Sequence, residues 1–170
     1  PPHLGGTGGP VEGDRYRRSS YAFNDFLSRR YSPYVATEGA FAATDRLGRV
    51  PSPNDTVQFA VLAFEGEYAA SDHVHVVDLY NPVDPVLLPR IAARQMQIDA
   101  AGGPPAEFTS RSNYAFLDGS VATRPFADVF LPPADMNGDG LVVGASDFVN
   151  RFDPRSAGRV TAAAAVRNAE

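Results

Sequence analysis

Cysteine and lysine are both absent from this chain of 170 residues. Without cysteine, the protein has neither disulfide bonds nor thiolate metal ligands. Without lysine, it has no Walker-type phosphate-binding loop, because that loop requires a lysine. All 15 basic residues are arginine. We attribute this bias to the codon usage of a GC-rich genome, since no physical demand excludes lysine at every position.

Long apolar runs are also absent. No run approaches 18 residues, so the sequence predicts neither a membrane span nor a signal-peptide core. The chain begins with Pro1 and not with Met, and we therefore expect a processed chain or a fragment whose targeting element lies upstream. The net charge of −5 provides no basic footprint, and we expect no nucleic acid to bind.

Glycine and proline are abundant, with 15 residues of each. This composition predicts many turns and long irregular arms around one domain. Apolar patterning predicts an α+β fold, with an antiparallel sheet and one packed amphipathic helix over 84–99. Strands are expected at 20–24, 57–64 and 73–77. Asp118-Gly119 between two alternating arms predicts a hairpin over 113–125.

Three parts follow from these patterns. We expect an extended arm at 1–19, an α+β head at 20–130, and a C-terminal segment at 131–170 that ends in an alanine-rich tail. Within the head, residues 32–56 carry scattered glycine, proline and asparagine and are predicted to form a long surface loop. Within the C-terminal segment, a short helix is predicted at 147–152.

The most informative motif is an acidic loop that begins at Asp135. Asp135, Asn137 and Asp139 place oxygen-bearing side chains at alternate positions, which is how a short loop surrounds a hard divalent cation. Gly140 follows and permits the sharp turn. The backbone carbonyl of Leu141 would supply a further ligand.

The end of this loop departs from the EF-hand pattern. The twelfth position, which should hold a bidentate acid, is Ser146, and Asp147 follows one residue later. A bulge at Gly144 would let Asp147 reach the ion. We predict a Ca²⁺ site of weak affinity, about 10⁻⁴–10⁻³ M or somewhat tighter. The alternative is a solvated acidic turn that binds no metal.

Other candidate sites are weaker. His73 and His75 share one face of the strand predicted at 73–77, but no third ligand stands at a recognisable spacing, so we favour a half-exposed strand over a zinc site. No serine, histidine and aspartate pattern pairs a nucleophile with a base, and we expect no enzyme. The glycine-rich run 5–9 lacks a flanking strand and helix, which favours a flexible arm over a phosphate site.

One cluster combines arginine with tyrosine, two residue types favoured at protein interfaces. We predict that it binds another protein subunit; the alternative is a solvated arm. Its members are Arg15, Tyr16, Arg17, Arg18, Arg29, Arg30, Tyr31 and Tyr34.

Two separated stretches carry a family resemblance. Residues 19–24 (SSYAFN) and 113–121 (NYAFLDGSV), with the apolar run 57–64 between them, resemble the globular head of planctomycete-type pseudopilin-like proteins. That family has a prepilin N-terminus, a Ser-Tyr-x-x-Asn strand and a C-terminal His-x9-Asp-Gly region. Phe108 stands where the family has its histidine, and the family's long hydrophobic N-terminal helix is missing. The acidic loop is similar to one dockerin-type calcium repeat.

The resemblance implies an exported structural subunit at the cell surface, in the periplasm or outside the cell. Its work would be assembly with other protein subunits, with calcium as a structural clamp on the C-terminal segment. Two further interpretations remain open. One is an accessory subunit of a larger membrane-associated complex. The other is a calcium-dependent binding module for carbohydrate or protein.

Overall fold

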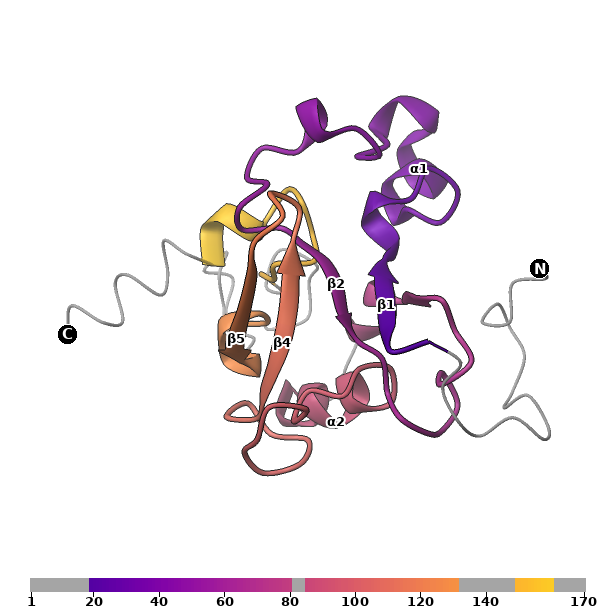
Figure 1. Ribbon diagram of the computed structural model, residues 1–170. Helices are drawn as coiled ribbons and strands as arrows, with labels where there is room; N and C mark the ends of the chain where they lie inside the picture. The colour runs from indigo at the N-terminus through magenta and orange to yellow at the C-terminus, as the bar shows by residue number, and fades with distance from the viewer. Residues whose placement is uncertain (1–18, 81–84, 132–148, 161–170) are drawn as a thin grey trace.

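The protein is built on a sheet of five strands in the order β3-β1-β2-β4-β5 (Figure 1). The structure, a computed structural model, describes residues 19–80, 85–131 and 149–160. The strands are β1 (Tyr21–Asn24), β2 (Val57–Val61), β3 (His73–Val74), β4 (Arg111–Phe116) and β5 (Val121–Pro125). Neighbouring strands are antiparallel except β1 and β3, which are parallel. This largely antiparallel sheet with short helices confirms the predicted α+β class.

The predicted hairpin is present between β4 and β5. Gly119 has a φ of +89°, a conformation that only glycine adopts readily. Asp118 fixes the turn because its Oδ1 accepts hydrogen bonds from the backbone N–H and the hydroxyl of Ser120, at 2.9 and 2.7 Å. The same bonds lower the pKa of the Asp118 carboxyl, since they favour its charged form.

Two short α-helices lie at opposite ends of the sheet. α1 (Pro33–Glu38) lies beyond the carboxyl end of β1, and α2 (Leu88–Ala93) lies near the start of β4 (Figure 1). The segment 32–56, predicted as a loop, therefore holds α1, and it also contains two 3-10 turns. Proline stands in the first turn of both α-helices, where its missing N–H costs nothing. No helix in the described part of the chain is long and apolar enough to span a membrane.

The helix predicted over 84–99 is much shorter than its periodicity indicates. A 3-10 turn (Pro85–Leu87) precedes α2, and the chain leaves the helix after Arg94. Met96 then forms an isolated antiparallel bridge with Leu62. Met96 and Ile98 are buried in this extended arrangement, as they would be on a helix face. The apolar character of these two positions therefore does not distinguish a helix from a non-helical segment.

One face of the sheet carries the core. β4 alternates between exposed and buried residues, so that Ser112, Tyr114 and Phe116 face inward. Phe126, which follows β5, is fully buried and its ring lies 5.3 Å from that of Phe130. The Phe130 ring in turn lies 5.6 Å from Phe152. Aromatic side chains from before and after residues 132–148 thus join a single core.

The C-terminal segment enters the sheet region in an extended form. Asn150 pairs with Phe130 in an antiparallel bridge, so the helix predicted at 147–152 is wrong over its described residues, 149–152. The backbone N–H of Val57, the first residue of β2, donates to the Arg151 carbonyl at 2.8 Å. Residues 149–160 therefore complete the head instead of trailing from it.

Candidate functional site

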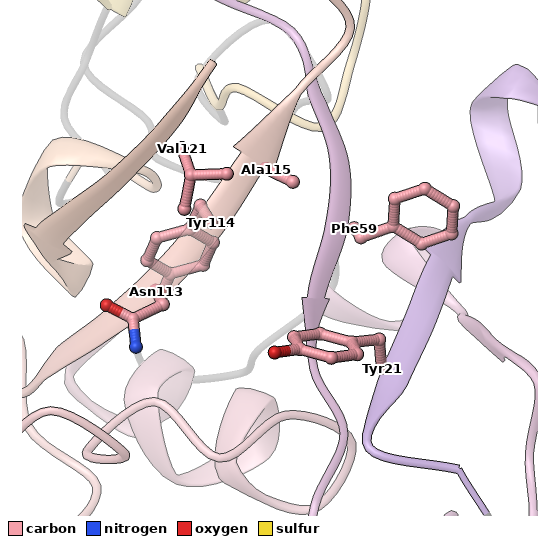
Figure 2. A pocket seen from close by; sticks show the side chains of 6 residues that line it. All are labelled: Tyr21, Phe59, Asn113, Tyr114, Ala115 and Val121. Atoms are coloured by element: carbon pink, nitrogen blue, oxygen red, sulfur yellow. The ribbon is translucent and has the colours of Figure 1, made fainter. Parts of the chain in front are cut away.

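The second face of the sheet exposes several large apolar side chains. Tyr21 on β1, Phe59 on β2 and Val121 on β5 are exposed by 58%, 36% and 69%. With Asn113 and Ala115 of β4, and with the inward-facing, almost fully buried Tyr114 between them, they line a shallow groove of about 360 Å³ (Figure 2). Large apolar side chains gathered on one face are typical of a surface that another molecule covers.

The register of the strands explains the shape of this groove. Phe59 stands opposite Ala115, and Ala115 stands opposite Val121, so one row crosses three strands. The small Ala115 side chain forms the floor between two larger walls. On the far side of Phe59, the Phe23 ring packs edge-on at 5.5 Å. The lining contains no charged side chain, so an apolar partner surface would meet no buried charge here.

The predicted Arg/Tyr interface divides in the structure. Arg29 and Arg30 are exposed, and the Arg30 guanidinium lies 5.4 Å from the centre of the Tyr31 ring. Tyr31 itself is half-buried, and its ring stacks on the His73 imidazole at 4.7 Å. The other four predicted members, Arg15, Tyr16, Arg17 and Arg18, lie outside the described residues.

Tyr34 ties α1 to the C-terminal segment. Its hydroxyl donates to Asp153 Oδ1 at 2.5 Å, and the Arg155 guanidinium lies 3.5 Å from the centre of its ring. Arg155 also forms a bidentate pair with Glu38, at 2.7 and 2.9 Å. Burial raises the pKa of the Tyr34 hydroxyl, and the bond to Asp153 raises it further. Tyr34 therefore links α1 to the segment around Asp153 and Arg155.

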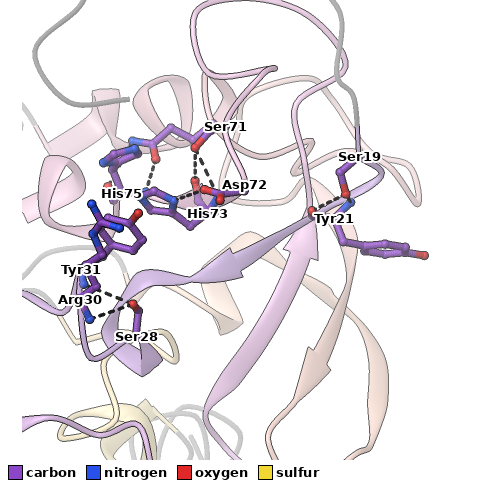
Figure 3. Close-up of polar contacts among 10 residues, drawn as sticks. Ser19, Tyr21, Ser28, Arg30, Tyr31, Ser71, Asp72, His73 and His75 are labelled. Carbon is purple, nitrogen blue, oxygen red and sulfur yellow. Dashed lines mark hydrogen bonds and ion pairs between the residues drawn. The ribbon is translucent and has the colours of Figure 1, made fainter. Parts of the chain in front are cut away.

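The two predicted strand histidines lie close together beside β1 (Figure 3). The centres of the His73 and His75 rings are 4.4 Å apart. His73 is only 5% exposed, which is more buried than a half-exposed strand implies, because the Tyr31 ring covers it. His73 Nδ1 lies 2.5 Å from Asp72 Oδ1, and the Gln95 amide bonds the backbone of His75 at 2.7 and 3.2 Å.

The histidine cluster does not gain a third ligand. Within the residues that the structure describes, no group of three histidine, aspartate or glutamate side chains is placed to hold a metal ion. The Asp72 carboxylate instead orients the His73 ring, as a neighbouring carboxylate commonly does. We interpret the cluster as packing at the sheet edge.

Asp25, which directly follows β1, is a buried carboxyl that sequence analysis did not single out. Burial raises its pKa to about 8, against the lowering effect of backbone hydrogen bonds from Val76 and Phe26. Its Oδ1 has no hydrogen-bond partner among the described residues. Asp25 therefore carries a proton in the folded protein up to about pH 8, which its sequence context alone does not reveal.

Asn24 is the other polar residue that sequence analysis left without a role. Its Nδ2 donates to the carbonyls of Val57 and Phe152, at 2.6 and 2.7 Å, and its Oδ1 accepts from the Phe26 N–H at 3.1 Å. The side chain is fully buried. One amide thus joins the end of β1, the start of β2 and the C-terminal segment. The only available signal was its place at the end of the SSYAFN motif.

The predicted calcium ligands Asp135, Asn137, Asp139, Leu141 and Asp147 all lie outside the described residues. The structure does describe the two points between which their segment runs. The Leu131 N–H donates to the Val149 carbonyl at 3.0 Å, and the Arg151 N–H donates to the Val129 carbonyl at 2.8 Å. Residues 131 and 149 are therefore held side by side.

A buried ion pair fixes the C-terminal side of this junction. Arg151 Nη1 lies 2.5 Å from Asp55 Oδ1, and Arg151 Nε donates to the Asp128 carbonyl at 2.7 Å. The Arg151 side chain is almost fully buried. Asn150 adds a turn, since its Oδ1 accepts from the N–H groups of Phe152 and Asp153, both at 2.9 Å.

Comparison with known proteins provides no relative for this chain. No protein-family model, curated protein or solved structure matches it.

Proposed function

We propose that this protein is an exported, non-enzymatic structural subunit of pilin-like type that assembles with other protein subunits and is stabilised by calcium. The observation that carries this proposal is the open apolar face of the sheet, around Tyr21, Phe59 and Val121. Aromatic side chains without charged neighbours are typical of the centre of a protein interface. Catalysis has no part in the proposal.

The positions of the two family-like motifs support the pilin-like part of the proposal. Residues 20–24 form β1, and residues 113–121 span most of β4 and the turn into β5. β2 lies between them and pairs with both β1 and β4. The resemblance thus falls on adjoining strands of one antiparallel sheet.

The junction at Leu131 and Val149 supports the calcium part. A loop whose ends are already fixed together loses less conformational entropy when it closes around an ion. Weak EF-hand-type sites are filled where calcium reaches millimolar concentration, as it does outside the cell. We therefore place the protein at the cell surface, in the periplasm or in the extracellular space.

The assembly is tested by the native state of the protein. Isolated from its native source in the presence of calcium, it should be recovered with further copies or with other polypeptides, and size-exclusion chromatography with light scattering should report the mass of that assembly. Partners that belong to a membrane would indicate an accessory subunit of a larger membrane-associated complex. A monodisperse monomer at high concentration, with residues 1–18 open to protease, would refute the proposal.

Calcium binding is tested by thermal unfolding. Calcium at about 100 times its dissociation constant, roughly 10–100 mM, should stabilise the protein by about 2.7 kcal/mol. That corresponds to a rise in Tm of roughly 5–11 °C for a domain of this size. Asp139→Ala should abolish the rise, whereas Asp99→Ala, which removes a carboxylate elsewhere, should preserve it. An unchanged Tm in calcium and in EDTA would exclude the site.

The exposed rings of Tyr21 and Phe59 also favour a second function, a calcium-dependent module that binds carbohydrate or protein at the cell surface. Aromatic rings on an open face can stack on the apolar side of a sugar. A glycan array read with and without calcium distinguishes the two functions. Calcium-dependent binding by a monomeric protein, lost in Tyr21→Ala, would favour the module.

A further inference from the structure

The outer edge of β5 is available for pairing. Within the hairpin, Phe116 N–H donates to the Ser120 carbonyl and Phe126 N–H donates to the Ser110 carbonyl, at 2.8 and 2.7 Å. Residues that exchange hydrogen bonds with a neighbouring antiparallel strand alternate with residues that do not. Ala122 and Arg124 therefore bond to β4, and the backbone groups of Val121 and Thr123 point away from the sheet.

These outward groups are accessible. Among the residues that the structure describes, β5 pairs with β4 alone, and the strand order places it last in the sheet. Val121 and Thr123 are both exposed. An exposed edge of this kind is a template for another strand unless it is blocked, and Pro125 blocks only its last position because proline has no N–H.

We propose that β5 pairs antiparallel with β5 of a second copy of this chain, with Ala122 facing Ala122 of the partner subunit across a twofold axis. In this register Val121 of each copy exchanges both backbone hydrogen bonds with Thr123 of the other. Pro125 then faces Gly119 of the other copy. Gly119 belongs to the turn and not to β5, so the N–H that Pro125 lacks leaves no carbonyl of β5 without a partner. This proposal deepens the proposed function, since it identifies one contact of the assembly.

Charge complementarity selects a second copy as the occupant. In the same register Arg124 faces Ser120 of the partner subunit, and Asp118 of the partner subunit lies on the diagonal, within reach of a long side chain. Asp118 is fully exposed. The buried Nε of Arg124 has no hydrogen-bond partner within the part of the chain that the structure describes. The twofold axis repeats this opposite-charge pair.

Shape supports the same choice. The groove ends at Val121, and pairing would place Thr123 of the partner subunit beside it, so the open faces of the two sheets would become continuous. The pairing is isologous and closes on itself, because β5 of each copy is used once. The opposite edge, β3, is only two residues long, so it offers little for further growth.

Disulfide trapping tests the register directly. Ala122 would occupy a non-hydrogen-bonded pair with a Cα separation of about 4.5 Å, which a disulfide bond can span. The chain has no cysteine, so Ala122→Cys introduces the only thiol. Under mild oxidation this variant should form a covalent dimer at least roughly tenfold faster than Val86→Cys, an exposed control on a different element.

Two variants test the backbone contact in the Ala122→Cys background. Thr123→Pro removes an outward N–H and should abolish the covalent dimer. Thr123→Ala also loses the bond from Thr123 Oγ1 to Asn113 Oδ1 but keeps that N–H, and it should cross-link like the parent. Circular dichroism of each variant checks that the sheet is intact. Asp118→Asn, which keeps the turn acceptor, should slow cross-linking at low salt only.

Equal cross-linking of Ala122→Cys and Val86→Cys would overturn the β5 contact. If the native protein is still recovered in an assembly, only this contact fails and the proposed function stands. If Thr123→Ala abolished the dimer together with Thr123→Pro, the side chain and not the strand edge would make the contact, and the proposed pairing would be wrong.

Discussion

Replacing Asn24 by alanine should cost a large part of the protein's stability. The amide is fully buried and makes three hydrogen bonds, to Val57, Phe152 and Phe26. Alanine would leave two carbonyls and one N–H buried without partners. Each such group costs about 1–3 kcal/mol, and because the three share one site we expect a total of roughly 3–6 kcal/mol.

The assay is equilibrium unfolding in urea, followed by far-ultraviolet circular dichroism at constant pH and calcium. Asn24→Ala should lower the midpoint with an unchanged slope, since the surface exposed on unfolding stays the same. Asn113→Ala is the matched control, because it removes an exposed asparagine of the same sheet that makes one bond, to Thr123. That control should lose about 0.5–1.5 kcal/mol.

A third variant separates the two functions of the amide. Asn24→Asp keeps the acceptor for the Phe26 N–H but loses both donor bonds, so it should be at least as unstable as Asn24→Ala near neutral pH. If Asn24→Ala lost no more than Asn113→Ala, the idea that this residue joins three segments would be refuted. If Asn24→Asp were fully stable, the donor bonds to Val57 and Phe152 would carry no weight.

Two further predictions concern buried ionisable side chains. Asp25→Asn should raise stability at pH 8 by on the order of a few kcal/mol and flatten the pH profile. The reason is that Asp25 has a pKa of about 8 in the folded protein and about 3.9 in the unfolded chain. The native protein therefore loses stability as the pH rises from about 3.9 to about 8. Identical curves of stability against pH for the native protein and Asp25→Asn would contradict this. Arg151→Met should cost about 3–5 kcal/mol in urea unfolding because Asp55 loses its buried partner. The double variant Arg151→Met, Asp55→Leu should recover much of the lost stability. If it recovered none, the loss would come from packing and not from the unpaired Asp55 carboxylate.

Most of the strands could be predicted from the sequence, but the strand predicted at 73–77 is only two residues long, at His73–Val74, and a 3-10 helix begins at Val76. The run 57–64 contains β2, and Asp118-Gly119 located the hairpin because its turn needs a positive φ at glycine. The helix over 84–99 was overextended, since apolar residues such as Met96 satisfy both a helix and an extended segment. α1 was missed because none of its residues is fully buried, so it leaves no clear periodic signal.

The candidate site was less predictable because it depends on contacts distant in sequence. In the sequence, Tyr21 and Phe59 look like ordinary strand residues. Only the folded sheet shows that no other described segment covers the face on which they lie. Tyr34 was predicted at an interface, and its hydrogen bond to Asp153, 119 residues away, could not be predicted from the sequence. The calcium loop shows the opposite case, because its signal is local and its predicted ligands lie outside the described residues.

The contact between Asn24 and Phe152 joins positions 128 residues apart, and this separation has a consequence for synthesis. A nascent chain that ends before Phe152 lacks the partner of a buried amide and one ring of the core. The head therefore completes only after Phe152 has left the ribosome, so the contacts of β1 are completed long after β1 itself has been synthesised.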